Sequence, residues 1–139
     1  MLDSKDKKIA AHLRFHGRDS IREIAKATEL RPSTVHQRLL HLEKEKTIEY
    51  YTAKFNNEDL SEGFIVFLWM TTKEDLPSSF FHNPSIKECF GITGEYDLLL
   101  KLKFPSLKEF NQYIIALRKN KIITKTLTQI VTITLKEEL

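Results

Sequence analysis

The feature that most constrains the fold is a change in the spacing of apolar residues about a third of the way along the chain. Up to residue 46, apolar side chains recur every three or four positions, which is the spacing of an amphipathic helix. From residue 48 onward they alternate with polar residues or form short unbroken runs, and both patterns are typical of strands. The chain of 139 residues is therefore expected to have an α+β fold, with a helical part followed by a sheet.

Three helices are predicted in the first part. The first is expected from Asp3 or Ser4 to just before Gly17, because glycine commonly follows the end of a helix. The second begins after an S-x-x-E capping box formed by Ser20 and Glu23. The third is expected over residues 32–46, since a proline suits the first position of a helix. The short turn between the second and third helices predicts a helix-turn-helix.

The third helix of this arrangement is expected to contact DNA. Burying Val35, Leu39 and Leu42 on one side turns the polar residues of its first half toward solvent. Serine, threonine, glutamine and arginine side chains suit base edges and phosphates. The candidate contacts are Ser33, Thr34, His36, Gln37, Arg38, His41 and Lys44, with Arg22 and Arg31 nearby. The alternative is a three-helix packing module whose polar side is simply solvated.

The second part predicts a ferredoxin-like βαββαβ domain. Residues 48–55 are prone to form a strand, and residues 56–63 form a linker. Beyond them the expected elements are strands at 64–72, 86–93, 96–104 and 124–136, a short helix at 78–82, and a helix opened by the capping box of Ser106 and Glu109. That order is the split βαβ arrangement. The last strand is expected to bury Leu127, Val131, Ile133 and Leu135.

Composition excludes several classes of protein. The single cysteine, Cys89, excludes a disulfide framework, and the longest apolar run, residues 64–70, is too short to span a bilayer. The charged N-terminus is unlike a secretory signal, so the cytoplasm is the expected location. His12 and His16 have a helical spacing that can bind metal, but without an evident third ligand they are interpreted as solvated residues. No motif of an enzyme active site occurs.

Two stretches resemble the Lrp/AsnC family, also called feast/famine regulatory proteins. Residues 2–55 resemble its winged helix-turn-helix, through LDSKDKKIAAHL, the stretch from SIREIA to LRPSTV, and LEKEKTIEYY. Residues 64–136 resemble its effector-binding and oligomerisation domain, through ITGEYDLLLKLKF and TKTLTQIVTITLK. The resemblance implies three segments: residues 1–55 bind DNA, residues 56–63 are a linker, and residues 64–139 bind effector and associate.

What the resemblance implies is a cytoplasmic transcription regulator with no cofactor. Its expected partners are double-stranded DNA, further copies of itself in dimers or octamers, and an amino acid. The amino acid is expected at the turn formed by Thr93, Gly94, Glu95, Tyr96 and Asp97. The residue types agree with this role, because a glycine permits a tight turn and a carboxylate can pair with an ammonium group. The alternative is an ordinary hairpin with a structural glycine.

The chain departs from the family pattern at several positions. Arg31 replaces a serine N-cap, Lys46 replaces a glycine, and Leu40 and His41 stand where basic residues are common. We therefore expect weaker and more salt-sensitive DNA binding, strengthened in acid by His36 and His41. The helix near residues 76–83 is also expected to be short, between Pro77 and Pro84, which would alter the effector cleft. Two alternatives to a regulator are a siroheme-decarboxylase-like enzyme and an architectural protein without specific readout of DNA.

Overall fold

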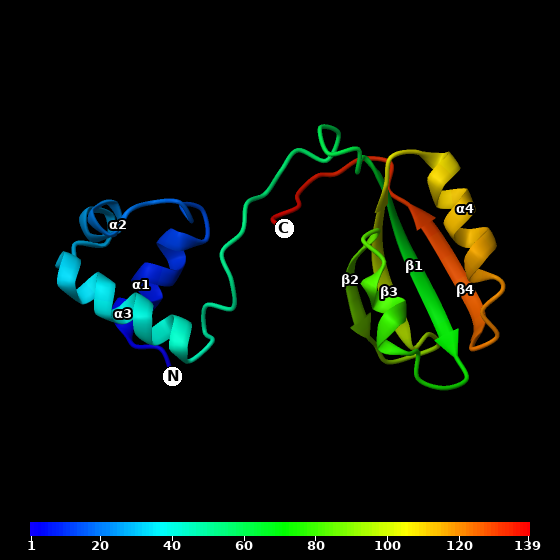
Figure 1. Cartoon of the computed structure of the whole chain (residues 1–139), viewed down its shortest axis with the longest axis horizontal. Coiled ribbons are helices and arrows are strands. Elements are labelled where there is room, and N and C mark those ends of the chain that lie inside the picture. The colour runs from blue at the N-terminus through cyan, green and yellow to red at the C-terminus, as the bar shows by residue number, and fades with distance from the viewer. The chain divides into compact units, whose positions relative to one another are not determined.

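The computed structural model describes residues 1–139, which form two compact units, residues 1–54 and 55–139. The first unit contains α1 (Ser4–Leu13), α2 (Ile21–Thr28) and α3 (Pro32–Lys44), and Figure 1 shows the three helices packed together. All three predicted helices are confirmed. Neither these helices nor that of the second unit is long and apolar enough to cross a membrane.

Local capping explains where the first two helices begin. Asp3 caps α1 and Ser20 caps α2, each within a reciprocal capping box whose other member is three residues further on. The ends of α2 and α3 are less regular. Glu29 and Lys46 adopt left-handed backbone conformations with φ of 58° and 55°, at positions that favour glycine. A lysine in place of a glycine at residue 46 therefore leaves a strained backbone.

The core of the first unit consists of residues that the helical periodicity selects. Ile9 of α1, Ile24 of α2 and Val35 of α3 are buried together with Ala25 and Leu42. Leu13, Ile21 and Leu39 pack around them half-buried. The predicted buried side of α3 is therefore confirmed, and its other side faces solvent.

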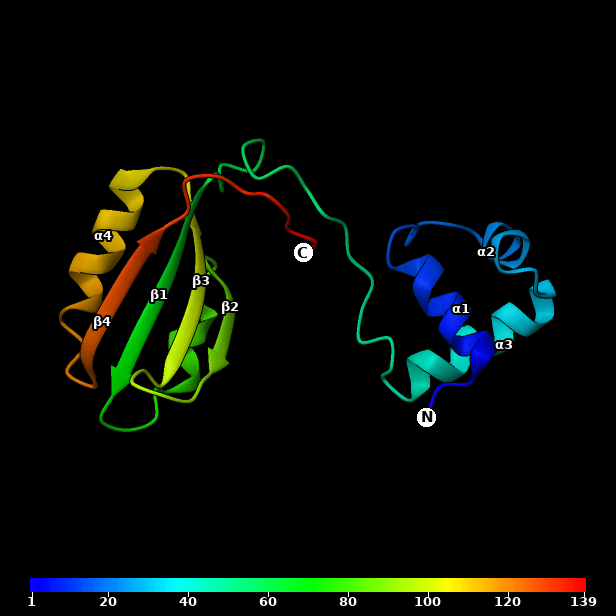
Figure 2. The same ribbon diagram turned by 180° about the vertical axis from the view of Figure 1, so that it is seen from behind.

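The second unit is a four-stranded antiparallel sheet covered on one face by a helix. Its elements are β1 (Phe64–Thr72), the short 3-10 helix η1 (Ser78–His82), β2 (Ile86–Gly91), β3 (Leu98–Phe104), α4 (Leu107–Leu117) and β4 (Ile123–Ile130). The strand order is β2-β3-β1-β4 and every neighbouring pair is antiparallel. This is the predicted ferredoxin-like arrangement, and Figures 1 and 2 show α4 lying along one face of the sheet.

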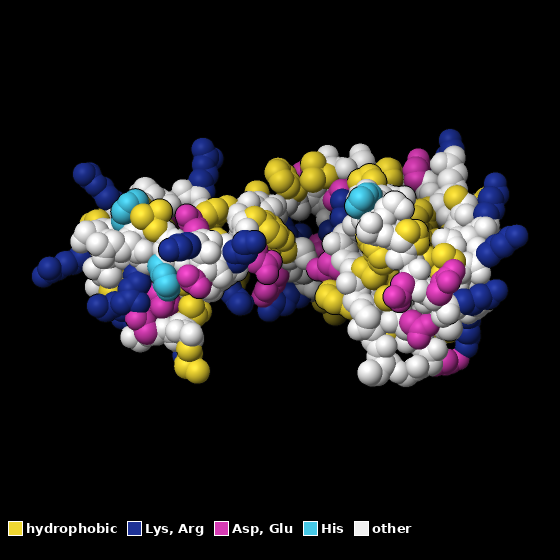
Figure 3. Space-filling model, turned by 60° about the horizontal axis from the view of Figure 1, so that its bottom comes forward, with side chains coloured by type: hydrophobic (Ala, Val, Ile, Leu, Met, Phe, Trp, Pro, Cys, Tyr) yellow, Lys and Arg dark blue, Asp and Glu magenta, His cyan; other side chains and the backbone are white.

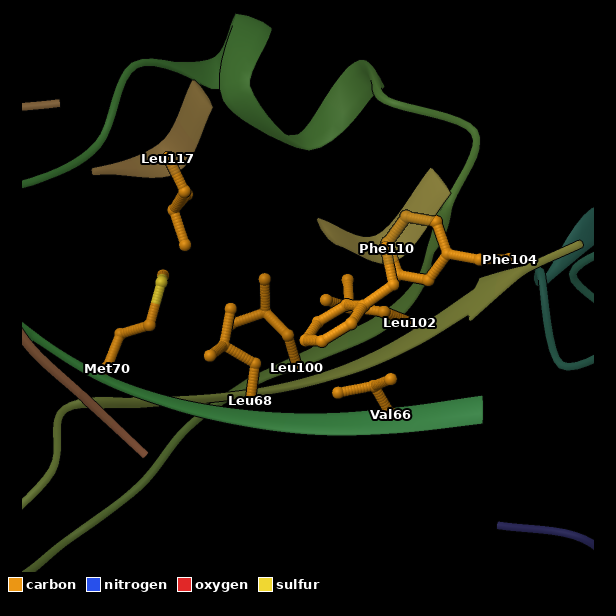
Figure 4. Close-up of a cluster of buried hydrophobic side chains, with 8 residues drawn as sticks. All are labelled: Val66, Leu68, Met70, Leu100, Leu102, Phe104, Phe110 and Leu117. Carbon is orange, nitrogen blue, oxygen red and sulfur yellow. The ribbon is translucent and has the colours of Figure 1, made fainter. Parts of the chain in front are cut away.

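The core of the second unit lies between α4 and the two central strands. Leu68 of β1 is paired with Leu100 of β3, and both are fully buried. Phe110 and Leu117 project from α4 onto these strand residues, as Figure 4 shows. Phe80 of η1 packs against the same cluster. The short helix predicted between the two prolines is confirmed, and it helps α4 to cover this face.

The opposite face of the sheet, here called the open face, has no helix. Its side chains include Phe67 and Trp69 of β1, Leu99 of β3 and Leu127 of β4, which the strand register places on one side. At one end of the face, Lys101 and Lys103 are 9% and 8% exposed. Glu137 from the C-terminal tail contacts their ammonium nitrogens at 2.5 Å and 3.0 Å. The tail therefore covers part of the open face and leaves the rest uncovered.

Three local predictions are wrong. Residues 48–55 form no strand, because no strand of the sheet runs alongside them. The last strand ends at Ile130 rather than near residue 136, because β1 begins at Phe64 and only one further backbone hydrogen bond, from the Val131 N–H to the Ile65 carbonyl at 2.9 Å, continues the pairing. Ile133 and Leu135 are 70% and 90% exposed and Leu127 is 42% exposed. At α4, Ser106 accepts from the Lys108 N–H and donates to the Glu109 carboxylate, so no reciprocal capping box forms.

Candidate nucleic-acid interface and effector turn

The outer side of α3 presents polar and basic side chains to solvent. Ser33, His36 and Gln37 near its start are exposed, as are His41 and Lys44 further along, whereas Thr34 and Arg38 are half-buried. Arg22 on α2 and Arg31 before α3 are exposed as well. On the face shown in Figure 3, Lys and Arg side chains project outward from several points of this unit. Seven of the nine predicted residues are thus open to contact with DNA, and Thr34 and Arg38 are only partly so.

The start of α3 lacks a side-chain cap. Arg31 occupies the N-cap position with extended backbone angles, but its side chain accepts no hydrogen bond from the helix. The first N–H groups of a helix have no acceptor within the helix, and they carry a partial positive charge. Pro32 removes one of these donors, and the remaining ones are available to a phosphate oxygen.

Arg38 has a structural role that the sequence interpretation missed. Its Nη1 donates to the Asp3 carboxylate and, at 3.3 Å, to Asp6. The Asp6 N–H, followed by Arg38, holds the pKa of Asp3 down from 3.8 to about 2, and Asp3 in turn raises the pKa of Arg38. Arg38 therefore joins α3 to the start of α1, and its charge is partly neutralised on the side where DNA contact was predicted.

A second polar contact holds the segment that follows α3. The Tyr51 hydroxyl donates to Glu43 Oε1 at 2.7 Å, which attaches this extended segment to the end of α3. Burial, together with the Glu43 carboxylate, raises the pKa of Tyr51 to about 12. The neighbouring Tyr50 is 71% exposed and Phe55 is 60% exposed. The segment therefore lies on the surface of the chain with aromatic side chains uncovered.

The predicted effector turn connects β2 to β3. Gly94 has a φ of +105°, a conformation that side chains make costly, and a Cβ there would meet no other atom. The glycine is thus required by the backbone of the turn rather than by close packing. Thr71 Oγ1 donates to the Glu95 carbonyl at 3.2 Å, which attaches the turn to the end of β1.

Asp97 links this turn to an adjacent cleft. One of its carboxylate oxygens accepts from the Thr72 N–H at 2.9 Å. The cleft has a volume of about 660 Å³ and is lined by Thr72, Lys73, Glu74, Asp75, Leu76, Phe81, Asp97 and Leu98. Three carboxylates and one ammonium group make its polar lining acidic. Of the five predicted effector residues, only Asp97 lines this cleft; the other lining residues carry no motif that sequence reasoning could have recognised.

Glu95 and Tyr96 are instead engaged with β4. The Lys125 ammonium pairs with the Glu95 carboxylate and lies 5.0 Å from the centre of the Tyr96 ring. The pairing with Glu95 raises the pKa of Lys125. Tyr96 also packs near Trp69 on the open face, with ring centres 6.0 Å apart. Thr93 is exposed. The turn therefore contributes to two surfaces, the acidic cleft and the open face.

Cys89 is not suited to nucleophilic chemistry. It packs half-buried against the core beneath α4, and burial raises the pKa of its thiol. A thiol is reactive mainly as the thiolate, which this environment disfavours. The residue therefore acts as a small apolar side chain.

A helix-turn-helix followed by an antiparallel sheet with one helical layer is an architecture that suits a DNA-binding regulator. Two family models match the chain: the AsnC-type helix-turn-helix domain over residues 2–43 and the Lrp/AsnC ligand binding domain over residues 74–139. The HTH-type transcriptional regulator FL11 of Pyrococcus horikoshii is 31% identical over 140 residues, which cover 98% of this chain and 93% of that protein. The leucine-responsive regulatory protein of Klebsiella pneumoniae is 30% identical over 120 residues, covering 81% and 73%.

Solved structures agree with this assignment. The transcriptional regulator NMB0573 from Neisseria meningitidis, solved in complex with L-Met, aligns with a TM-score of 0.91 and 25% identity over 99% of this chain and 94% of that chain. LrpC of B. subtilis aligns with a TM-score of 0.85 and 25% identity, covering 98% of each. The chain belongs to the Lrp/AsnC family of helix-turn-helix transcriptional regulators. Its relatives are named as regulators, which supports a regulator over the enzyme considered from sequence.

Proposed function

We propose that this regulator recognises DNA with the first half of α3 inserted into the major groove. Helix-turn-helix proteins contact base edges with the N-terminal residues of the second helix of the motif. Here that region carries Ser33, Thr34 and Gln37, with free backbone N–H groups at its start. The observation that carries the proposal is this exposed polar helix start next to an uncapped N-terminus. Phosphate contacts would come from Arg22, Arg31, His36, His41 and Lys44, with Arg38 secondary because of its ion pairs.

Replacement of Gln37 by alanine tests base recognition. A bidentate glutamine contact discriminates between bases by about 1–3 kcal/mol, so Gln37→Ala should reduce affinity for the preferred site while leaving affinity for random DNA nearly unchanged. Footprinting on the upstream region of the protein's own gene, followed by titration of the protected site, measures this effect. Lys44→Ala should weaken binding to both DNAs and lower the salt slope by about one. Lys121→Ala, an exposed lysine of the other unit, is the matched control. Equal loss on specific and random DNA in Gln37→Ala would contradict base recognition.

We also propose that an amino acid binds in the acidic cleft beside Asp97 and modulates the regulator. The cleft volume of about 660 Å³ accommodates such a molecule, and its carboxylates can pair with an ammonium group. The Neisseria neighbour was solved with L-Met, so L-methionine is the first compound to test. Both the turn and the cleft support the proposal, since Asp97 belongs to each.

The Asp97→Asn variant separates the effect of the carboxylate charge from that of the hydrogen bond to Thr72. Asp97→Asn keeps an oxygen that can accept from the Thr72 N–H but removes the negative charge. The wild-type protein should gain thermal stability with added L-methionine, whereas the variant should keep its basal stability and lose that gain. Thermal shift across the amino acids, coupled to a sizing measurement, provides the readout. If both proteins respond equally, the effector binds at another site. If neither responds to any amino acid, the proposal of an amino-acid effector is wrong, while the proposal of DNA binding is unaffected.

Self-association in the cytoplasm completes the proposal. The open face has Phe90 and Leu127 54% and 42% exposed, next to the half-buried Phe67, Trp69 and Leu99. An apolar sheet face of this kind is favourable to cover with a second copy. We propose a homodimer as the basic form, with larger assemblies built from it.

A further inference from the structure

A cluster of metal-binding side chains lies at the end of α1, outside both sites described above. It consists of His12 in the last turn of the helix, His16 just after it, and Asp19 immediately before the N-cap of α2. One ligand atom from each residue lies within 4.8 Å of the other two. His12 Nε2 and Asp19 Oδ2 are already 2.8 Å apart, and the two imidazole rings stack with centres 4.6 Å apart.

The backbone keeps these three residues together. The His16 N–H donates to the His12 carbonyl at 3.1 Å, and the Asp19 N–H donates to the His16 carbonyl at 3.2 Å. These two turns therefore bring first His16 and then Asp19 back close to His12. Asp19 is the third ligand that was not evident from the sequence. It lies seven residues after His12, but α1 ends at Leu13, so helical spacing does not predict that the two residues are close.

The three side chains of this cluster differ in their exposure to solvent. The side chains of His12 and Asp19 are only 16% and 31% exposed, so their interaction with a cation is partly shielded from water. His16 is exposed and leaves a path from solvent. Zinc prefers imidazole nitrogens and carboxylate oxygens at about 2.0–2.2 Å in tetrahedral geometry, which places ligand atoms roughly 3.4 Å apart. The ligand atoms here lie up to 4.8 Å apart and the two imidazole rings are stacked 17° from parallel, so binding requires the rings to turn until their nitrogens converge on the ion.

We propose that His12, His16 and Asp19 bind a divalent transition-metal ion of the zinc type, with water at the fourth position. Two imidazoles and one carboxylate are a donor set suited to this class of metal rather than to calcium or magnesium. The ion replaces the hydrogen bond between His12 and Asp19 and joins the end of α1 to the start of α2. Metal binding therefore stabilises the helix-turn-helix unit, because the folded form holds the ligands together and the unfolded form does not.

Zinc titration of the full-length protein tests this site. After removal of metal by a chelator and dialysis, calorimetry should detect one Zn²⁺ per chain, and thermal unfolding should shift upward with Zn²⁺ concentration. His16→Ala removes an exposed ligand whose observed side-chain contact is the stack on His12, so the fold should persist while affinity falls at least about tenfold. Asp19→Asn keeps a hydrogen-bond acceptor for His12 but loses the charge, and it should also weaken binding.

Other histidines provide the control. His82→Ala removes an exposed histidine of the other unit and should leave zinc affinity unchanged. His36 and His41, five positions apart on α3, point in different directions and cannot bind one ion together. Substitution of Zn²⁺ by Co²⁺ adds a spectroscopic readout, with visible absorption of a tetrahedral site in the wild type and its loss in His16→Ala. Zinc affinity that is the same in wild type, His16→Ala and Asp19→Asn, or that falls as much in His82→Ala, overturns the proposal, as does the absence of stoichiometric binding.

Discussion

At the residue scale, Asp3 has two functions that depend on its charge to different degrees. Its carboxylate accepts from the Asp6 N–H at 2.9 Å as the cap of α1, and it pairs with Arg38 of α3. The first contact requires only an oxygen acceptor, whereas the second requires an anion. Because the pKa of Asp3 is lowered from 3.8 to about 2, its charge stabilises the folded unit.

This lowered pKa predicts an acid-dependent loss of stability. The contribution is complete above the ordinary pKa of 3.8 and decreases as the pH falls through the folded value of about 2. Asp3→Asn keeps the cap but not the charge, so its unfolding midpoint should vary less than that of the wild type over this range. Helix content followed during thermal unfolding at several pH values measures the difference. Asp59→Asn, which changes an exposed carboxylate outside the helices, should retain the wild-type pH dependence; parallel curves for wild type and Asp3→Asn would contradict this account.

The contacts that sequence reasoning missed are those between residues with no fixed spacing. Arg38 and Asp3 are 35 positions apart, and only the packing of α3 on α1 brings them together. From sequence, Arg38 has the same features as any basic residue on an exposed helix surface. The exposed positions Ser33 and Gln37 were predictable, because helical periodicity alone determines which side of α3 is buried.

At the element scale, the missing cap of α3 predicts that a capping residue in place of Arg31 raises the stability of the unit and lowers its affinity for DNA. Arg31 has the extended backbone of an N-cap but provides no side-chain acceptor. Arg31→Ser should stabilise the unit by about 0.5–2 kcal/mol through a new hydrogen bond to the helix, and should weaken DNA binding through the lost positive charge. Urea unfolding and DNA titration measure the two effects. Arg31→Ala should show the loss in affinity without the gain in stability, and equal stability of the serine and alanine variants would exclude a capping effect.

Elements that depend on local signals were predicted well, and those that depend on a partner were not. Caps, glycines and helical periodicity lie within a few residues, so α1, α2 and the start of α3 follow from sequence. Residues 48–55 and the end of the chain carry equally clear strand patterns. However, a strand forms only where another strand provides its hydrogen bonds, and the structure continues the pairing past Ile130 with only one such bond, from the Val131 N–H to the Ile65 carbonyl. A strand pattern in the sequence is therefore not enough to predict a strand, since the partner that it needs lies outside the pattern.

At the scale of the whole molecule, we propose that the first unit contacts DNA and the second unit associates with further copies. The helix-turn-helix unit has its own core, and the sheet unit has another beneath α4. Neither core includes the exposed apolar side chains of the open face, such as Phe90 and Leu127. A modest net charge of +3 gives one copy limited attraction to DNA, so the proposed dimer would raise the effective affinity by presenting two recognition helices at once.

This division predicts that association can be disrupted without unfolding the chain. Phe90 is 54% exposed at the edge of the open face, so a lysine there costs little in one copy but places a charge in an apolar contact between copies. Phe90→Lys should raise the dissociation constant of the dimer by at least about tenfold, or ~1.4 kcal/mol, and weaken DNA binding by loss of avidity. Sizing over a range of concentrations measures the first effect and DNA titration the second. Phe15→Lys makes the same substitution at a 74% exposed phenylalanine of the helix-turn-helix unit and should leave the dimer intact. If both variants dimerise as the wild type does, the copies associate through a surface other than the open face.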